Sequence, residues 1–108
     1  MAGIIKGKVK DSTYNFMLTS ATVAVYAATD SLPENKPGTL LQFSLPDNFG
    51  EFIVQPLPVG KALKLIITHT GYKPYAKKFI INKDKPVKDF GLLFMYQDDE
   101  VGAIHWKR

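Results

Sequence analysis

The chain has 108 residues and a mass of 12.1 kDa, with 45% hydrophobic and 22% charged residues. This composition excludes a disordered chain and is typical of one ordinary domain, because a chain of this size buries about two thirds of its surface on folding. The longest apolar run, residues 23–28, is far shorter than the roughly 18 residues of a membrane-spanning helix, so we expect no transmembrane segment.

The types of charged and sulfur-containing residues exclude several functions. There is no cysteine, which excludes thiol nucleophiles, thiolate metal sites and disulfides. The net charge is +4, and 13 of the 14 basic residues are lysine. Arginine reads bases and phosphates through paired hydrogen bonds, and Arg108 is the only one, so we expect no nucleic-acid partner. Eight lysines and one acid lie between residues 61 and 88, which indicates either a solvated strand face or a surface for an acidic partner.

The first residues carry neither the charged and apolar stretches nor the cleavage site of a secretory signal. We therefore expect either a cytoplasmic protein or a mature segment whose leader has been removed.

Alternation of apolar and polar residues with a period of two dominates the chain, and no window shows a helical stripe, which predicts an all-β fold. The alternating segments cover residues 4–10, 21–28, 39–45, 51–55, 62–69, 74–81 and 92–96. Turn-forming residues separate them about every ten residues, a spacing typical of a two-sheet sandwich. We therefore predict a seven-stranded antiparallel β-sandwich. It forms one domain over residues 3–96, and residues 97–108 are a linker or the truncated start of a following domain.

The first segment shows the clearest alternation, since Ile5 and Val9 share one face with the glycine between them while lysines occupy the other. Asp11 then begins a turn. The second segment, residues 21–28, leads into an unpatterned loop over residues 29–38.

The third and fourth segments, residues 39–45 and 51–55, predict a hairpin whose turn can place Asn48 or Gly50 at a positive φ. The turn also has the composition of a calcium loop, but it lacks the twelve-residue ligand spacing of that motif. We therefore interpret Asp47 and Asn48 as side chains that satisfy the turn's own backbone amides.

The fifth segment ends in His69. Because no second histidine lies at metal-ligand spacing from it, we expect His69 to be a structural residue bonded to a backbone group. In the sixth, residues 74–81, Lys77 would share the inner face with Tyr75 and Phe79, which indicates a bulge or an edge strand. Residues 82–89 are interpreted as a charged loop.

No motif for catalysis or cofactor binding is present. The four serines stand in no Gly-x-Ser-x-Gly setting, and no glycine-rich loop could hold a phosphate. We therefore expect no enzyme, no cofactor and no metal. Trp106 with Tyr14, Tyr72 and Tyr75 could offer flat rings to a sugar, which makes a glycan the alternative ligand.

The linear order of several short motifs is more specific than any one of them. These motifs are residues 5–11, 21–26, 30–32, 47–54, 57–61, 71–75 and 89–91. Together they resemble the carboxypeptidase regulatory-like domain, in the version found at the N-terminus of outer-membrane β-barrel and TonB-dependent receptor proteins of Bacteroidetes-type bacteria. The resemblance covers about residues 4–96 and implies a transthyretin-like sandwich with no catalytic or ligand residues. Residues 102–106 depart from the valine-rich segment that follows this domain in the receptors.

The resemblance implies a non-catalytic module in the periplasm or at the cell surface, associated with the outer membrane. Such a module would act as a spacer, or as a docking domain for other domains of its parent protein or for another envelope protein. Exposed strand edges favour docking by β-augmentation, and we expect Tyr72, Tyr75, Lys77 and Lys78 to form that surface. The alternatives are a carbohydrate-binding module and an accessory domain of a zinc carboxypeptidase.

Overall fold

The computed structural model describes residues 2–14, 16–28 and 38–97, and no helix occurs among them. The strands are β1 (Gly3–Asp11), β2 (Thr22–Ala27), β3 (Leu40–Ser44), β4 (Glu51–Leu57), β5 (Ala62–Thr68), β6 (Tyr75–Ile80) and β7 (Val87–Met95). The predicted loop residues 29–37 and the tail, which includes Trp106, lie outside this description. Within the described part of the chain, no helix is long and apolar enough to cross a membrane.

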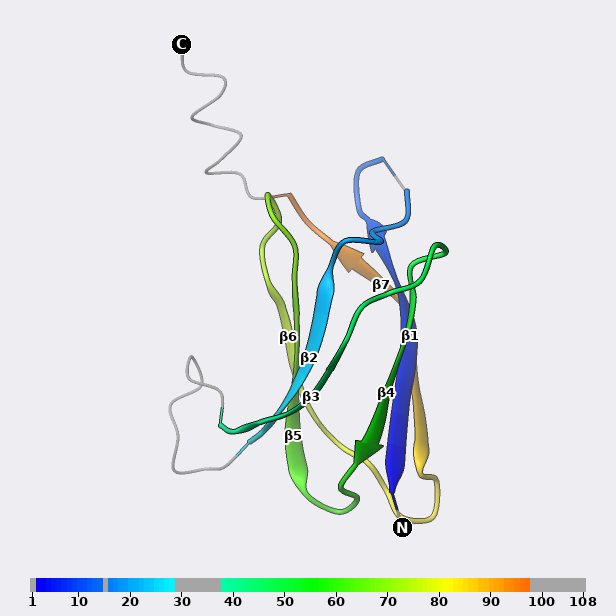
Figure 1. Cartoon of the computed structure of the whole chain (residues 1–108), viewed down its shortest axis with the longest axis vertical. Helices are drawn as coiled ribbons and strands as arrows, with labels where there is room; N and C mark the ends of the chain where they lie inside the picture. The colour runs from blue at the N-terminus through cyan, green and yellow to red at the C-terminus, as the bar shows by residue number, and fades with distance from the viewer. Residues whose placement is uncertain (1, 15, 29–37, 98–108) are drawn as a thin grey trace.

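The strands form two sheets that pack face to face (Figure 1). One sheet has the order β4-β1-β7 and the other the order β3-β2-β5-β6. The predicted all-β sandwich of seven strands is therefore confirmed. One pairing corrects the prediction of a wholly antiparallel fold: β1 and β7 run parallel, with Ile4 opposite Val87 and Asp11 opposite Met95.

The core lies between the two sheets and is built from alternate residues of the strands. In β5 the inner positions Leu63, Leu65 and Ile67 are fully buried, and in β1 so are Ile5 and Val9. This is the pattern that the period of two predicted, because successive side chains of a strand point to opposite faces.

Gly7, in β1, lies where a side chain would clash with its neighbours. A β-carbon at Gly7 would lie 2.8 Å from Cζ of Phe52 and 3.1 Å from the carbonyl oxygen of Gly91. Phe52 is buried in the core from β4, the strand beside β1. The absent side chain therefore makes room for the largest fully buried residue.

The turn between β3 and β4 has the predicted chemistry, but it connects the two sheets. Asp47 Oδ1 accepts hydrogen bonds from the amides of Phe49 (2.8 Å) and Glu51 (3.0 Å), and Gly50 has a φ of 76°. The predicted hairpin is nevertheless wrong, since β3 pairs with β2 and β4 pairs with β1. Turn residues fix where the chain reverses, whereas a strand with one buried face shows the same pattern in either sheet.

The last strand is longer than predicted. It begins at Val87, so Lys88 and Asp89, which were expected in a charged loop, lie within β7. The register with β1 shifts in the middle of the strand, where Gly91 has a φ of 69° and donates its amide to the Asp89 carboxylate (2.8 Å). Because this bulge adds a residue, it interrupts the alternation, and only the segment after it keeps a recognisable pattern.

The sixth strand, β6, is an edge strand of the four-stranded sheet. An edge strand was one of the two predicted explanations for Lys77 on an apolar face. β6 contains no bulge, because its register with β5 continues unbroken from Ile80 opposite Ala62 to Tyr75 opposite Ile67. Lys77 therefore occupies an inner position of an edge strand, where its ammonium group can still reach water.

Candidate interaction surfaces

Asp11, at the end of β1, is the one polar residue among the buried side chains that the structure describes. Its Oδ1 accepts the amides of Thr13 (2.7 Å) and Tyr14 (2.6 Å). Its Oδ2 accepts hydrogen bonds from the hydroxyl of Tyr72 and, more weakly, from the side-chain Nε2 of Gln97 (3.4 Å). The carboxylate therefore holds the β1–β2 turn and the β5–β6 turn together at one end of the sandwich.

The same contacts set the ionisation of both groups. Burial alone would raise the pKa of Asp11, but the hydrogen bonds from Tyr72, from the amides of Tyr14 and Thr13, and from Gln97 lower it below 3.8. Burial and the bond to the Asp11 carboxylate raise the pKa of Tyr72 to about 12. Asp11 is therefore charged and Tyr72 neutral at physiological pH, which favours a structural pair over a proton-transfer pair.

The four residues expected to form a docking surface do not lie together. Tyr72 is half-buried and bound to Asp11 in the β5–β6 turn. Lys78 stands on the outer face of its sheet, directly opposite Lys64. Tyr75 and Lys77 stand on the inner face, because their partners on β5 are the buried Ile67 and Leu65. Tyr75 and Lys77 therefore share the inner face, and Lys77 and Lys78 both line a small pocket of about 230 Å³ on β6.

The surface that Tyr75 and Lys77 share is the side of the sandwich between β6 and β7, where each strand is the edge of its own sheet. We call it the open flank and define it by Tyr75, Lys77 and Phe79 of β6 and by Lys88, Phe90 and residues 92–95 of β7. The two edge strands of this flank, β6 and β7, belong to different sheets and do not pair with each other. Burial at the flank, the largest contribution, raises the pKa of Tyr75, so its phenol is neutral there.

Aromatic side chains cover the core at the open flank. The rings of Phe79 and Phe90 meet edge to face, with centroids 5.3 Å apart and planes at 89°. Lys88, opposite the buried Ile5, places its Nζ 5.8 Å from the centroid of the Phe90 ring. Neither Phe90 nor Lys88 was predicted to lie on a candidate surface, because the bulge at Gly91 conceals the strand that carries them.

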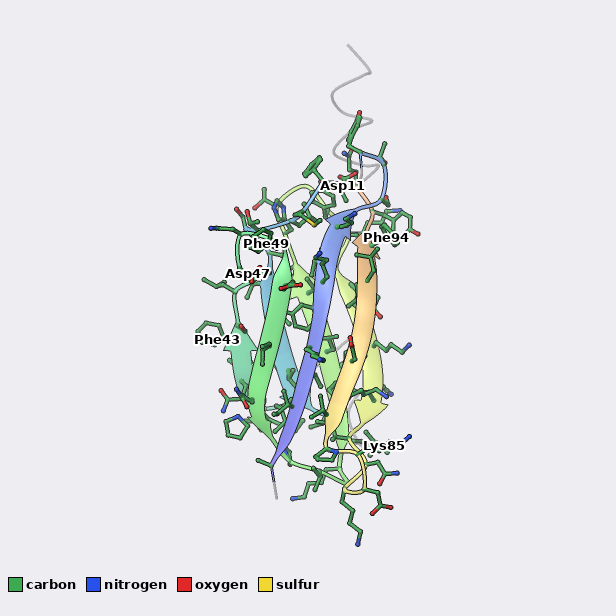
Figure 2. All side chains as sticks on the ribbon, turned by 90° about the vertical axis from the view of Figure 1, so that its right-hand side faces the viewer. Asp11, Phe43, Asp47, Phe49, Lys85 and Phe94 are labelled. Carbon is green, nitrogen blue, oxygen red and sulfur yellow. The ribbon has the colours of Figure 1, made fainter. Side chains whose placement is uncertain are left out.

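A groove of about 800 Å³ runs along the upper part of the open flank. Lys73, Pro74 and Tyr75 line one side of it, and residues 92–97 line the other. Figure 2 shows Phe94 on this side of the molecule and Phe43 of β3 on the opposite side. Leu92 and Phe94 are 45% and 39% exposed beside the groove.

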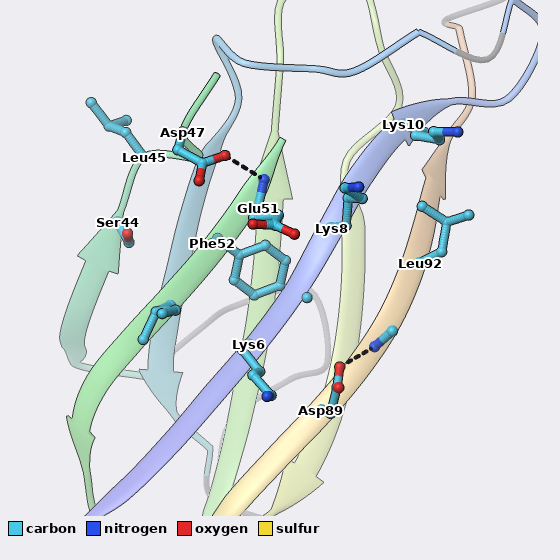
Figure 3. A pocket seen from close by; sticks show the side chains of 13 residues that line it. Lys6, Lys8, Lys10, Ser44, Leu45, Asp47, Glu51, Phe52, Asp89 and Leu92 are labelled. Atoms are coloured by element: carbon cyan, nitrogen blue, oxygen red, sulfur yellow. Dashed lines mark hydrogen bonds between the residues drawn. The ribbon is translucent and has the colours of Figure 1, made fainter. Parts of the chain in front are cut away.

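A second groove, of about 740 Å³, lies over the outer face of β4, β1 and β7 (Figure 3). Lysines 6, 8 and 10 line its floor together with the acids Asp47, Glu51 and Asp89. Lys8 stands opposite Glu51 and Lys6 opposite Asp89 on the neighbouring strands. These cross-strand pairs balance the charge, so the groove does not select an anionic or a cationic ligand.

Three of the residues considered for sugar or metal binding, Tyr72, Tyr75 and His69, make other contacts. Tyr72 gives its hydroxyl to Asp11, and Tyr75 packs against the core, so among these tyrosines only Tyr14 is well exposed. His69 Nδ1 lies 2.8 Å from the carbonyl oxygen of Thr70, which confirms a histidine bonded to the backbone. Within residues 2–14, 16–28 and 38–97, no group of three or more potential ligands could hold a metal ion.

Comparisons with known proteins identify the fold and nothing finer. No protein-family model matches the chain, and no curated protein matches its sequence. The chain is structurally similar to a pilus 2b backbone protein of group B streptococcus, with a TM-score of 0.63 and 16% identity over 94% of this chain and 43% of that one.

Two enzymes of known structure share the same sandwich. A 9R-lipoxygenase from Cyanothece has a TM-score of 0.61 and 18% identity over 86% of this chain and 16% of that one. A chlorocatechol 1,2-dioxygenase from Pseudomonas putida has a TM-score of 0.54 and 14% identity, over 87% and 58%. The chain therefore spans less than two thirds of each of these proteins, and the likeness concerns the β-sandwich alone.

Proposed function

We propose that this chain is a non-catalytic module of a larger bacterial envelope protein, in which it acts as a spacer and docking domain. The parallel pairing of β1 with β7 is the observation that carries this proposal. Two parallel neighbours begin at the same end of a sheet, so the start of β1 and the end of β7 lie at opposite ends of the molecule (Figure 1). A domain with this connectivity adds its long dimension to a chain of domains.

The shape and the polar groups support the same role. The nine-residue strands β1 and β7 each run about 30 Å along the sandwich, which is elongated in the direction of its strands (Figure 1). Its buried carboxylate holds two turns together, and its described histidine is bonded to the backbone. These groups stabilise the scaffold instead of converging on a cleft.

The cellular setting is the further part of the proposal. The resemblance to the carboxypeptidase regulatory-like domain favours an outer-membrane protein of the TonB-dependent receptor type as the parent, with the module in the periplasm or at the cell surface. The similarity to a pilus backbone protein supports a role in an extended surface structure.

Tandem fusions of the full chain test the spacer role. Small-angle scattering should show a maximum dimension that grows with each added copy by at least about 30 Å, the length of a nine-residue strand. Copies that fold side by side, with no growth in length, would contradict it. Fractionation of cells that produce the natural protein tests the envelope setting, because recovery in the cytosol alone would exclude it.

A further inference from the structure

The open flank presents an incompletely protected strand edge. Among the described strands, β7 has β1 as its only neighbour in the sheet, and its other side faces the groove. From Leu92 to Met95 this edge carries no charge, proline or glycine. The edge strand β6 carries two lysines, and β4 carries Pro56, both of which discourage pairing with another chain. Residues 92–95 lack such protection, as do residues 40–44 of the edge strand β3, which lies beside β4.

The surroundings of this edge are basic. Residues 69–80 and 87–97 contain four lysines and a single acid, Asp89. Asp89 faces away from the flank, opposite Lys6, and accepts the amide of Gly91. On the flank itself the charged side chains are Lys77 and Lys88, from facing edge strands, and Lys73 lines the groove beside them. A partner that enters here would therefore meet positive charge beside aromatic rings.

We propose that the β7 edge binds an extended segment of another polypeptide that alternates acidic and apolar side chains. The segment would add a fourth strand to the β4-β1-β7 sheet by hydrogen bonding with the backbone of residues 92–95. The proposal names the partner of the docking module proposed above and therefore rests on that function.

The geometry assigns a role to each side of such a segment. Its inner side chains would cover Tyr75 and the Phe79–Phe90 pair, which already close this side of the core. Because successive side chains of a strand point to opposite faces, the inner side chains are the acidic ones, and their carboxylates would lie near Lys77, which is two residues, or about 7 Å, along β6 from Tyr75. Its outer side chains would cover Leu92 and Phe94, the exposed apolar residues of β7.

The probe is a nonapeptide of alternating glutamate and valine whose two ends are blocked. It is added to the full chain. Amide hydrogen exchange should slow between Leu92 and Met95 at the alternate amides that face away from β1, because a new strand bonds every second amide of an edge. A lysine–valine peptide should bind at least about tenfold more weakly. Binding of the glutamate peptide should weaken as salt rises from about 0.05 to about 0.5 M.

Two controls separate strand addition from charge attraction. A peptide N-methylated at the residues that face β7 keeps its charge but loses its donors, and it should no longer protect the edge. Lys77→Glu should weaken binding about fivefold, whereas Lys61→Glu, in the β4–β5 connection, should change it less than about twofold.

Three results would overturn the proposal. Equal binding of the N-methylated peptide would show that the backbone edge is not used. Protection, before peptide is added, of the β7 amides that face away from β1 would show that this chain covers its own edge. Protection that rises with protein concentration would assign the edge to a second copy. If tandem fusions still extend as expected, these results remove the acidic partner and leave the spacer role intact.

Discussion

The hydroxyl of Tyr72 donates a hydrogen bond to the buried carboxylate of Asp11, a residue 61 positions earlier in the chain. Asp11 ends β1 in the three-stranded sheet, and Tyr72 lies in the turn that follows β5 in the four-stranded sheet. The bond therefore connects the two layers at one end of the sandwich, where Lys73 also donates its amide to the carbonyl oxygen of Tyr96 (2.8 Å).

Replacement of Tyr72 by phenylalanine should lower the free energy of unfolding by about 1–3 kcal/mol, because the buried carboxylate loses a donor. Urea unfolding at neutral pH measures this loss. Tyr75→Phe is the matched control, since the structure records no hydrogen bond of its hydroxyl within the described residues, and it should cost less than about 0.5 kcal/mol. Equal losses in the two variants would show that the Tyr72–Asp11 bond contributes nothing specific.

The stability that this pair contributes should depend on pH in a defined direction. The pKa of Asp11 is lowered from 3.8 on folding, so its contribution is complete above that value and is lost as the pH falls through the lower folded pKa. The pKa of Tyr72 is raised from 10.0 to about 12, so its contribution is complete below pH 10 and is lost as the pH rises toward 12.

The difference in unfolding free energy between the natural chain and Tyr72→Phe isolates this effect from other titrating groups. It should be constant from about pH 5 to about pH 9 and shrink on both sides. A difference that stays level into the alkaline range would contradict the raised pKa of Tyr72.

Gly7→Ala should destabilise the sandwich by about 1–3 kcal/mol, because the new methyl group would lie 2.8 Å from the ring of Phe52. The double variant with Phe52→Leu removes the ring atom in contact. Thermal unfolding of the single and double variants should show that Gly7→Ala costs less in the leucine background. Strictly additive costs would mean that the backbone, and not the ring, resists the methyl group.

Two adjacent residues of β5 test the assignment of the sheet faces. Ile67→Ala should cost about 2–5 kcal/mol, since Ile67 is fully buried between the sheets. Ile66→Ala should cost at least about 1 kcal/mol less, because Ile66 lies half-buried on the outer face. Chemical denaturation of both variants gives the comparison. The reverse order would require a shift of register by one residue.

The β3–β4 turn should depend on its own carboxylate and not on calcium. Asp47→Ala removes the acceptor for two backbone amides and should cost about 0.5–2 kcal/mol, while Asp47→Asn retains an acceptor and should cost less. Millimolar calcium should leave the midpoint of thermal unfolding unchanged in all three chains. A calcium-dependent rise in the natural chain, absent from Asp47→Ala, would identify a metal site.

The sequence by itself determined the local structure. The period of two placed Ile5, Val9 and the inner residues of β5 in the core, because a half-buried strand cannot change face without breaking its alternation. The turn at Asp47 could also be predicted, since its hydrogen bonds join residues within four positions of each other. The edge position of β6 was one of the two predicted explanations for Lys77, because Lys77 interrupts an apolar face.

Only the tertiary structure decided which strands are neighbours and which polar groups meet. β3 joins β2 instead of β4, and β7 runs parallel to β1, because packing of the inner faces selects the partners and the alternation is the same for each. The Tyr72 hydroxyl donates to Asp11 from the other sheet, and Phe90, next to the bulge at Gly91, packs against Phe79. These contacts join residues distant in the chain, where no local pattern records them.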